Sequence, residues 1–201
     1  MSDATETEQT KTALRAAALA LRDALPAAER AAAAAAIAAR PFPLQVVSGM
    51  IVAGFSPMKA KSEINPIPLL RKLSDAGAQL ALPAIAGRGK ALIMRAWKFG
   101  DLFKSGQWGI REPLPEAPEV APDILIVPLA CFDRAGHRVG YGAGYYDMTI
   151  NALRAKKKVV AIGIGFAAQE ISSVPATERD ARLDLVLTER EVIDLQIRRS
   201  D

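Results

Sequence analysis

Residues 123–166 read DILIVPLACFDRAGHRVGYGAGYYDMTINALRAKKKVVAIGIGF, and this stretch decides the fold. Residues 123–132 form a nearly continuous apolar run, which predicts a buried strand. A glycine-rich turn follows, after which residues 145–157 predict a helix and residues 159–166 a second buried strand. Two strands joined in this way by one helix form a right-handed βαβ unit with parallel strands. The sequence therefore predicts an α/β fold.

The flanking segments supply further helices and strands. The alanine-rich residues 11–40 predict two helices, because Pro26 interrupts the segment and Pro41 follows it. Residues 99–122 hold several glycines and prolines, which is typical of a long loop. Further elements are predicted as strands at residues 49–55, 79–83, 91–97 and 183–188, as a helix at 65–76, and as a terminal helix or tail at 189–198.

Length and composition favour a single domain. The chain has 201 residues, of which 50% are hydrophobic, and this is enough for one sizeable core. We expect one three-layer α/β/α domain over residues 11–198, Rossmann-like and with a mostly parallel central sheet. We expect a flexible polar N-terminus over residues 1–10 to precede it.

The sequence also bears on the compartment. Cys131 is the single cysteine, so no internal disulfide can form and a reducing compartment fits best. The N-terminal residues are polar and acidic, which is typical of neither a secretory signal nor a membrane anchor. Apolar runs elsewhere fall short of the ~20 residues needed to span a bilayer. We therefore expect a cytoplasmic protein that has no membrane partner.

The positive charge of the chain favours an anionic partner. A formal net charge of +4 is compatible with a nucleic acid, a nucleotide or a polycarboxylate. Aromatic residues are few, and the basic residues are spread along the chain instead of forming one dense arm. These features argue against nucleic acid and leave a nucleotide and a polycarboxylate open.

The glycine-rich turn is the first candidate site. Gly140, Gly142 and Gly144 lie between a buried strand and a helix, where backbone N–H groups can bind an anion. Arg134 and Arg138 could add charge-assisted hydrogen bonds to a phosphate. The glycine spacing matches neither the dinucleotide-binding fingerprint nor the Walker A loop. From these residues alone, a phosphate site and a tight structural turn both remain open.

Residues 127–147, VPLACFDRAGHRVGYGAGYYD, resemble the signature of the 5-formyltetrahydrofolate cyclo-ligase family. Other segments match the family in the same order along the chain, namely Lys11-x-x-Leu14-Arg15, Glu63-Ile64, residues 108–113 (WGIREP), and the segment from Val174-Pro175 through Asp180 to Leu183-Asp184-Leu185-Val186. Together the matches extend from Lys11 to Glu189.

This resemblance implies an enzyme that uses ATP and Mg²⁺ to cyclise 5-formyltetrahydrofolate to 5,10-methenyltetrahydrofolate. ADP and phosphate would be released, and a phosphorylated formyl group would be the intermediate. The partner implied is 5-formyltetrahydrofolate, with or without a polyglutamate tail, and the enzyme is expected to be a monomer. The alternative is a nucleotide-binding module of the same fold that does not catalyse a reaction.

The resemblance also implies the site residues. Those expected to bind ATP are Lys11, Thr12, Ala13, Leu14, Arg15, Arg134, Arg138, Val139, Gly140, Tyr141, Gly142, Ala143, Gly144, Tyr145 and Tyr146. Those expected to bind the folate are Phe55, Met58, Glu63, Trp108, Tyr141, Gly142, Ala143, Gly144 and Tyr145, with Glu63 accepting N–H groups of the pterin. Lys11, Arg15 and Arg138 are expected to be catalytic because they neutralise phosphate charge. Asp147 and Asp184 are expected to hold Mg²⁺, with Asp180 as a weaker third candidate.

Ordinary structural interpretations exist for several of these residues. Lys11 and Arg15 lie four residues apart, so they could form a solvated basic helix face. Asp147 fits the general preference for acids in the first turn of a helix. His137 is the only histidine, and its position suggests a loop residue more than an acid–base catalyst.

Overall fold

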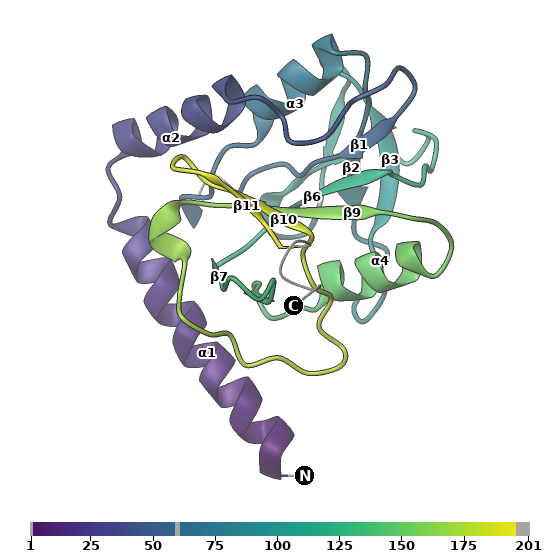
Figure 1. Ribbon diagram of the computed structural model, residues 1–201. Coiled ribbons are helices and arrows are strands. Elements are labelled where there is room, and N and C mark those ends of the chain that lie inside the picture. Colours follow the sequence, from purple (N-terminus) through teal and green to yellow (C-terminus); the bar gives the residue numbers. More distant parts are fainter. Residues whose placement is uncertain (1, 59–60, 196–201) are drawn as a thin grey trace.

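A seven-stranded sheet forms the centre of the molecule in the computed structural model, which describes residues 2–58 and 61–195 (Figure 1). The strand order is β11-β10-β9-β6-β1-β2-β3, and only the two edge strands, β3 and β11, pair antiparallel with their neighbours. The strands are β1 (Ile51–Ala53), β2 (Gln79–Ala84), β3 (Ile93–Trp97), β6 (Ile124–Pro128), β9 (Val160–Ile164), β10 (Leu185–Leu187) and β11 (Val192–Asp194). The predicted α/β fold with a mostly parallel sheet is confirmed.

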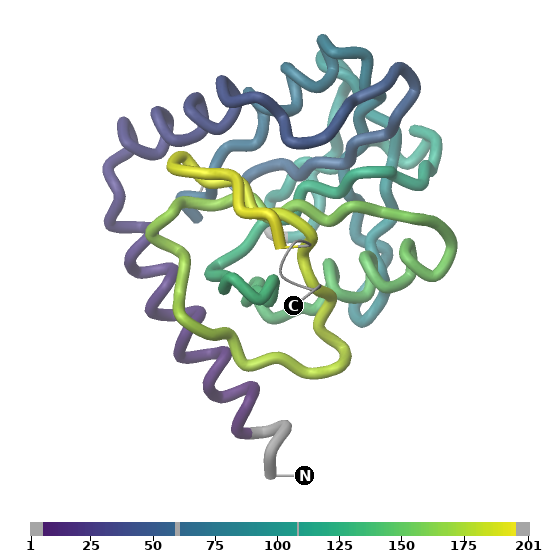
Figure 2. The backbone as a smooth tube through the Cα atoms, in the orientation of Figure 1, coloured from purple at the N-terminus to yellow at the C-terminus, as the bar shows by residue number. Residues whose placement is uncertain are grey.

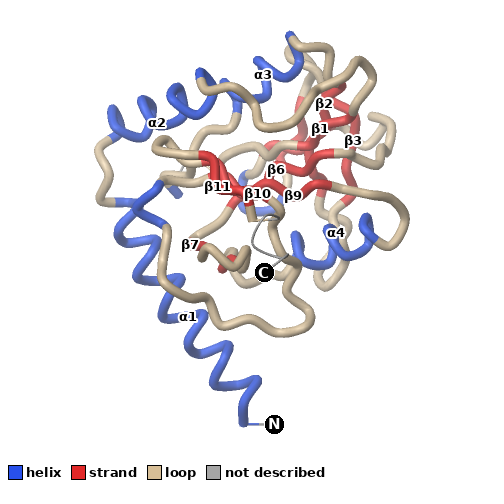
Figure 3. The backbone as a smooth tube through the Cα atoms, in the orientation of Figure 1, coloured by secondary structure: helices blue, strands red, loops and turns tan. Residues whose placement is uncertain are grey.

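Helices cover both faces of the sheet (Figures 1 and 3). Helices α2 (Ala27–Ala39) and α3 (Ile67–Asp75) lie on one face, and α4 (Tyr145–Arg154) lies on the other. Because successive strand residues point to opposite faces, Val52 packs with Leu70 of α3 while the next residue, Ala53, packs in the core that holds Ile150 of α4. The predicted three-layer arrangement is thus confirmed.

The N-terminal helices follow the proline pattern. Helix α1 spans Ser2–Asp23, and α2 begins directly after Pro26. Helix α1 starts well before Lys11, so residues 2–10 are helical in the segment that we predicted as a polar tail (Figure 1). Figure 2 shows the coil of α1 leading toward the N-terminus. The flexibility of that segment and the division into a tail and one domain stay predictions.

The central βαβ unit is present, with one local difference. Strand β6 leads through α4 to β9, and β6 and β9 pair in parallel. The predicted strand over residues 123–132 is interrupted after Pro128, because β7 (Cys131–Phe132) turns away and pairs with β8 (Arg138–Val139). A small hairpin therefore opens the glycine-rich turn.

Two segments differ from their predictions. Residues 99–122 include a short hairpin, β4 (Phe103–Ser105) and β5 (Arg111–Pro113), with the 3-10 turn η2 (Gln107–Gly109) between its strands. The predicted terminal helix or tail at residues 189–198 is wrong for its described part. There β11 forms instead, because Ile193 is buried in the core between two more exposed neighbours, as an edge strand requires. Residues 196–198 lie outside the described residues.

The connections diverge at the pair β1 and β6. Strand β1 leads through α3 to β2 on one side, whereas β6 leads through α4 to β9 on the other. Since β1 and β6 are parallel neighbours, the segments that leave their carboxyl ends separate and open a crevice between them. Ligands of open α/β sheets bind in such crevices. No helix in the described part of the chain is long and apolar enough to cross a membrane.

Candidate active site

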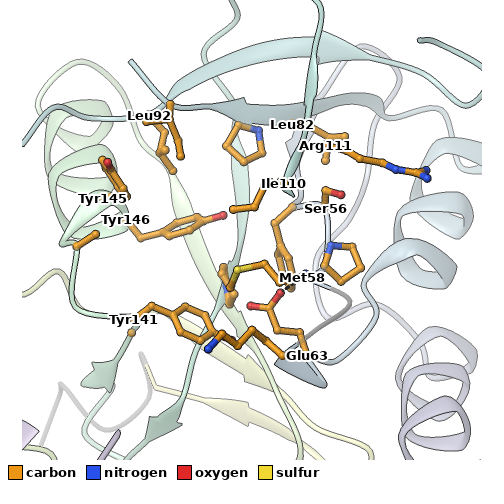
Figure 4. A pocket seen from close by; sticks show the side chains of 18 of the residues that line it. Ser56, Met58, Glu63, Leu82, Leu92, Ile110, Arg111, Tyr141, Tyr145 and Tyr146 are labelled. Atoms are coloured by element: carbon orange, nitrogen blue, oxygen red, sulfur yellow. Dashed lines mark hydrogen bonds between the residues drawn. The ribbon is translucent and has the colours of Figure 1, made fainter. Parts of the chain in front are cut away.

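A cavity of about 1390 Å³ occupies this crevice (Figure 4). Its walls come from segments that are far apart in the sequence. They are Lys11 and Arg15 of α1, residues 55–58 and 61–63 after β1, residues of β2, β3 and the β4–β5 hairpin, the continuous segment 138–147, and Asp180. Most of the residues that the resemblance implied are therefore brought to one cavity.

Lys11 is fixed on the wall of the cavity by an acid from the other end of the chain. It is 7% exposed, and its Nζ lies 2.6 Å from Oδ2 of Asp180. Burial by itself would raise the pKa of Asp180, but the hydrogen bonds from Lys11 and Thr177 outweigh it and hold the pKa below its usual value. Asp180 is therefore an ionised partner for Lys11, and this ion pair joins α1 to the C-terminal part of the domain.

Arg15 joins α1 to the glycine-rich turn. Its Nε donates a hydrogen bond of 2.7 Å to the backbone oxygen of Gly140. Its guanidinium also lies against Gly142, where an added Cβ would be 3.5 Å from Arg15 Cζ. The two predicted phosphate-binding segments, residues 11–15 and 138–146, thus meet at Arg15.

Gly142 has a positive φ of 94°, which side chains other than glycine adopt at a cost. We expect Gly142→Ala to lower the free energy of unfolding by about 1–2 kcal/mol. Gly140→Ala is the matched control, because Gly140 has no atom within 4 Å of an added Cβ and lacks a positive φ. Urea denaturation measures both. Equal losses in the two variants would contradict the assigned strain at Gly142.

The buried Arg138 and the partly buried Asp147 form an ion pair at the cavity. Nη2 of Arg138 lies 2.8 Å from Oδ1 of Asp147, and its Nη1 donates to the backbone oxygen of Ala181. Oδ1 of Asp147 also accepts the backbone N–H of Ala181 at 3.0 Å. Asp147 lies in the first turn of α4, where the helix dipole favours a negative charge. The carboxylate is therefore held on the cavity wall from two sides.

The start of α4 offers backbone donors to the same cavity. Its N-cap is Gly144, which has a φ of 67° and provides no side-chain cap. The adjoining residues Val139 to Tyr146 all line the cavity. Uncapped N–H groups at a helix N-terminus bind anions well, especially where glycine keeps Cβ atoms away. The predicted anion cradle is thus geometrically possible.

Glu63 lines the cavity from the segment that follows β1. Its Oε2 accepts the backbone N–H of Met58 at 2.6 Å, and its carboxylate also interacts with the hydroxyl of Tyr141. Figure 4 shows Glu63 and Tyr141 approaching each other from different segments. Burial raises the pKa of Glu63, although these hydrogen bonds and the charge of Arg22 oppose the rise. Phe55 also lines the cavity, as predicted.

Some predicted ATP-binding residues lie elsewhere. Thr12 and Ala13 are exposed on α1, and Leu14 packs against the core cluster of Cys131. Arg134 does not line the cavity. Its guanidinium instead forms ion pairs of 2.6 Å with Glu170 and Glu191.

The two predicted metal ligands are not brought together at the cavity. Asp147 lines it, but Asp184 does not. Asp184 is 6% exposed, and its Oδ2 accepts from Arg154 at 2.5 Å and from the backbone N–H of Ala161 at 2.8 Å. Among the described residues, no group of three or more histidine, cysteine, aspartate or glutamate side chains is placed to hold a metal ion.

Trp108 lies in η2, but its side chain is outside the described part of the structure. Its neighbours Gly109, Ile110 and Arg111 do line the cavity. The apolar wall from β2, β3 and the segments around them was not predicted; it includes Leu82, Leu92, Trp97, Phe99 and Phe103. Their spacing indicated only strands and a loop, because core and ligand-facing apolar residues have the same pattern.

Arg22, which contacts Tyr141 from α1, was also missed. A signal for it was present in the sequence. Arg22 follows Lys11 by eleven residues and Arg15 by seven, so all three lie on one helix face.

The comparison with known families agrees with this geometry. A family model described as the 5-formyltetrahydrofolate cyclo-ligase family matches residues 7–189. The chain belongs to this family. It is therefore a cyclo-ligase, an enzyme of the ligase class, and the matched range includes every cavity segment from Lys11 to Asp180.

Individual relatives support the assignment of the chain to the cyclo-ligase family. A 5-formyltetrahydrofolate cyclo-ligase of Mycolicibacterium smegmatis is 32% identical over 155 residues, which are 73% of this chain and 77% of the relative. The Escherichia coli K12 protein of the same name is 30% identical over 136 residues, 65% of this chain and 74% of the relative. The NMR structure of 5,10-methenyltetrahydrofolate synthetase from Aquifex aeolicus superposes with a TM-score of 0.74 at 26% identity, over 92% of this chain and 93% of that one.

Proposed function

We propose that this enzyme cyclises 5-formyltetrahydrofolate to 5,10-methenyltetrahydrofolate, with ATP converted to ADP and phosphate. The observation that carries the proposal is the convergence of Lys11, Arg15 and the glycine-rich turn with Glu63 in one cavity. The cations and backbone amides suit a polyphosphate, and the partly buried carboxylate of Glu63 suits a ring with N–H donors. Membership of the cyclo-ligase family supports the same reaction.

ATP is needed because the oxygen of an amide-like formyl group is a poor leaving group. In the proposed reaction the formyl oxygen attacks the γ-phosphorus, the bond to the β-phosphate breaks, and ADP leaves. The second folate nitrogen then attacks the formyl carbon and loses its proton, while the C–O bond breaks and phosphate departs. No covalent bond to the enzyme is required.

The residues of the chain mainly position the reactants and balance their charge. Lys11 and Arg15 would bind phosphate oxygens from α1, and the amides of residues 140–146 would bind them from the start of α4. Arg138 would act both as a nearby cation and as the support of Asp147. Glu63 would orient the pterin so that the formyl oxygen faces the γ-phosphate.

We propose Asp147 as the protein ligand for Mg²⁺. Mg²⁺ commonly takes one or two carboxylates together with phosphate oxygens and water, so one cavity carboxylate is compatible with a site completed by the nucleotide. The position of Asp147 beside the phosphate-binding segment fits this requirement. A bound Mg²⁺ would neutralise phosphate charge there.

We expect Asp147→Asn to raise the Mg²⁺ concentration needed for half-maximal rate by about 10- to 100-fold. The amide keeps the size of the side chain but removes the negative charge. Magnesium titrations of the cyclisation rate at saturating ATP measure the effect. Asp184→Asn is the comparison, and because Asp184 binds Arg154 and Ala161 away from the cavity, we expect it to lower stability and leave the magnesium requirement in place. An increase in that requirement only in Asp184→Asn would contradict the choice of Asp147.

The function itself is tested with purified protein, 5-formyltetrahydrofolate, ATP and Mg²⁺. The absorbance of the methenyl product should rise with time, and one ADP should form for each product molecule. The alternative, a nucleotide-binding module without turnover, predicts ADP or ATP binding by calorimetry with no absorbance change. That outcome in folded protein would refute the proposed activity.

A further inference from the structure

Arg22 is the most deeply buried cation near the cavity. It lies in the last turn of α1 and is only 1% exposed. Its Nη1 donates a hydrogen bond of 2.7 Å to the hydroxyl of Tyr141. Its Nε and Nη2 are buried and have no hydrogen-bond partner among the described residues. A buried, incompletely satisfied guanidinium is costly, so its retention calls for a physical explanation.

The adjacent acidic residue, Asp23, does not explain why Arg22 is buried. Oδ1 of Asp23 lies 3.5 Å from Nε of Arg22, but the Asp23 side chain is 50% exposed, so water weakens this ion pair. The guanidinium also lies 5.8 Å from the centre of the Tyr141 ring, close enough for a cation–π interaction. The hydrogen bond and the ring contact of Arg22 therefore both involve Tyr141, which lines the cavity.

The chemistry of the groups fixes the direction of the hydrogen bonds. Arginine has only donors, so the Tyr141 oxygen must accept from Arg22. The phenolic proton of Tyr141 is then available to the carboxylate of Glu63, with which this hydroxyl interacts. Glu63 also accepts the N–H of Met58 at 2.6 Å. Arg22, Tyr141 and Glu63 thus form a chain from a buried cation to a carboxylate in the cavity.

We propose that Arg22 is a positioning residue for the folate. Through the hydroxyl of Tyr141, it holds the Glu63 carboxylate ionised and oriented toward the pterin. This inference rests on the proposed function, because it assigns the pterin to Glu63. Helix α1 would then have two roles. Arg22 would position the folate through Tyr141, and Lys11 and Arg15 on the same helix face would bind the phosphates.

The electrostatics around Glu63 agree with this role. Among the described residues, the charged and titratable groups that interact with Glu63 are Arg22 from α1, Tyr141 from the glycine-rich turn and Tyr146 from α4. Burial raises the pKa of Glu63, whereas the Tyr141 hydrogen bond and the charge of Arg22 lower it. Binding that needs the carboxylate is present above the pKa of Glu63 and is lost as the pH falls through it. Removal of Arg22 should therefore move that loss to higher pH.

The first test compares Arg22→Met with wild type. We expect the acidic limb of kcat/KM for 5-formyltetrahydrofolate to move up by about one pH unit, because an opposite charge near a carboxyl typically shifts its pKa by that much or more. At a pH on this limb, kcat/KM should be about tenfold lower, whereas KM for ATP should change less than twofold. Arg22→Lys keeps the charge and should restore part of the shift. An equal loss at every pH would indicate a purely structural role and overturn the proposal.

The second test is independent of turnover. The Glu63 carboxyl carbon is titrated by ¹³C NMR in the ligand-free protein, and the Glu63→Gln spectrum identifies its signal. We expect a higher pKa in Arg22→Met than in wild type. If this shift appears in a protein that does not form methenyl product, the proposed function fails but the link from Arg22 to Glu63 stands. An unchanged Glu63 titration overturns the link.

The third test asks whether Arg22 acts through Tyr141. The double variant Arg22→Met/Tyr141→Phe should lose no more folate kcat/KM than Tyr141→Phe alone, because the phenylalanine already breaks the chain. Additive losses would contradict it. If Arg22→Met does not fold, the same comparisons are made with Arg22→Lys and with Tyr141→Phe, whose Glu63 pKa should also rise. An unshifted Glu63 pKa in Tyr141→Phe then overturns the proposal.

Discussion

Lys11→Met should lower kcat/KM for ATP by about 100- to 1,000-fold, the range found when a preorganised group that stabilises transition-state charge is removed. Lys11 is held at the cavity by Asp180 at 2.6 Å, so its ammonium is already in place before the nucleotide arrives. Methionine has a similar length but no charge. It would leave the Asp180 carboxylate beside the phosphates, and this adds repulsion to the lost attraction.

The effect is measured by ATP titration of the initial rate of methenyl formation. Lys90→Met is the matched control, because Lys90 is exposed and does not line the cavity. Lys11→Arg keeps the charge and should retain more activity than Lys11→Met. If both Lys11 variants bind ATP as wild type does, then Lys11 serves only to join α1 to Asp180. Urea denaturation of each variant separates a loss of folding from a loss of binding.

Glu63→Gln should lower kcat/KM for 5-formyltetrahydrofolate by about 100- to 1,000-fold, since hydrogen bonds to a charged group contribute roughly 1.5–3 kcal/mol each and a pterin edge can donate two. A carboxylate accepts at both oxygens, whereas the glutamine amide turns one acceptor into a donor. The N–H₂ group of the glutamine would then face one of the pterin N–H groups, and two donors cannot form a hydrogen bond. Because Glu63 and Lys11 lie in different segments of the cavity wall, nucleotide binding should persist.

Glu63→Gln should also change how kcat/KM for the folate depends on pH. The wild-type folate kcat/KM should fall as the pH decreases through the raised pKa of Glu63, because protonation removes an acceptor. Glu63→Gln cannot titrate there and should lack this limb. Glu116→Gln, an exposed glutamate away from the cavity, is the control. If the acidic limb of wild type persists unchanged in Glu63→Gln, a group other than Glu63 titrates there. Calorimetry with ADP is the control for an intact nucleotide site.

The fold could be predicted where hydrophobic runs are long. Residues 124–128 and 160–164 are buried on both faces, so their sequence is apolar throughout and the strands are evident. Strand β11 has only three residues and one buried side chain, Ile193. Such a short edge strand depends on its neighbour β10, and no local pattern distinguishes it from a tail. The β4–β5 hairpin was not predicted either, because each of its strands also has only three residues.

The site could be predicted only in part, because partners distant in sequence decide where a charged side chain points. The segment from Arg138 to Asp147 is continuous and was expected at the cavity as a unit. Arg134 lies near it in sequence, but Glu170 and Glu191 pair with its guanidinium outside the cavity. Asp184 is likewise drawn to Arg154. A single sequence does not show these pairs.

The ion pair between Lys11 and Asp180 joins residues that are 169 positions apart. During synthesis on the ribosome, α1 emerges early, but Lys11 can pair with Asp180 only after nearly the whole chain has been made. If ATP binds at Lys11 as proposed, it should stabilise the protein only at the end of translation, and chains that stop before Asp180 should gain no protection from ATP against a protease.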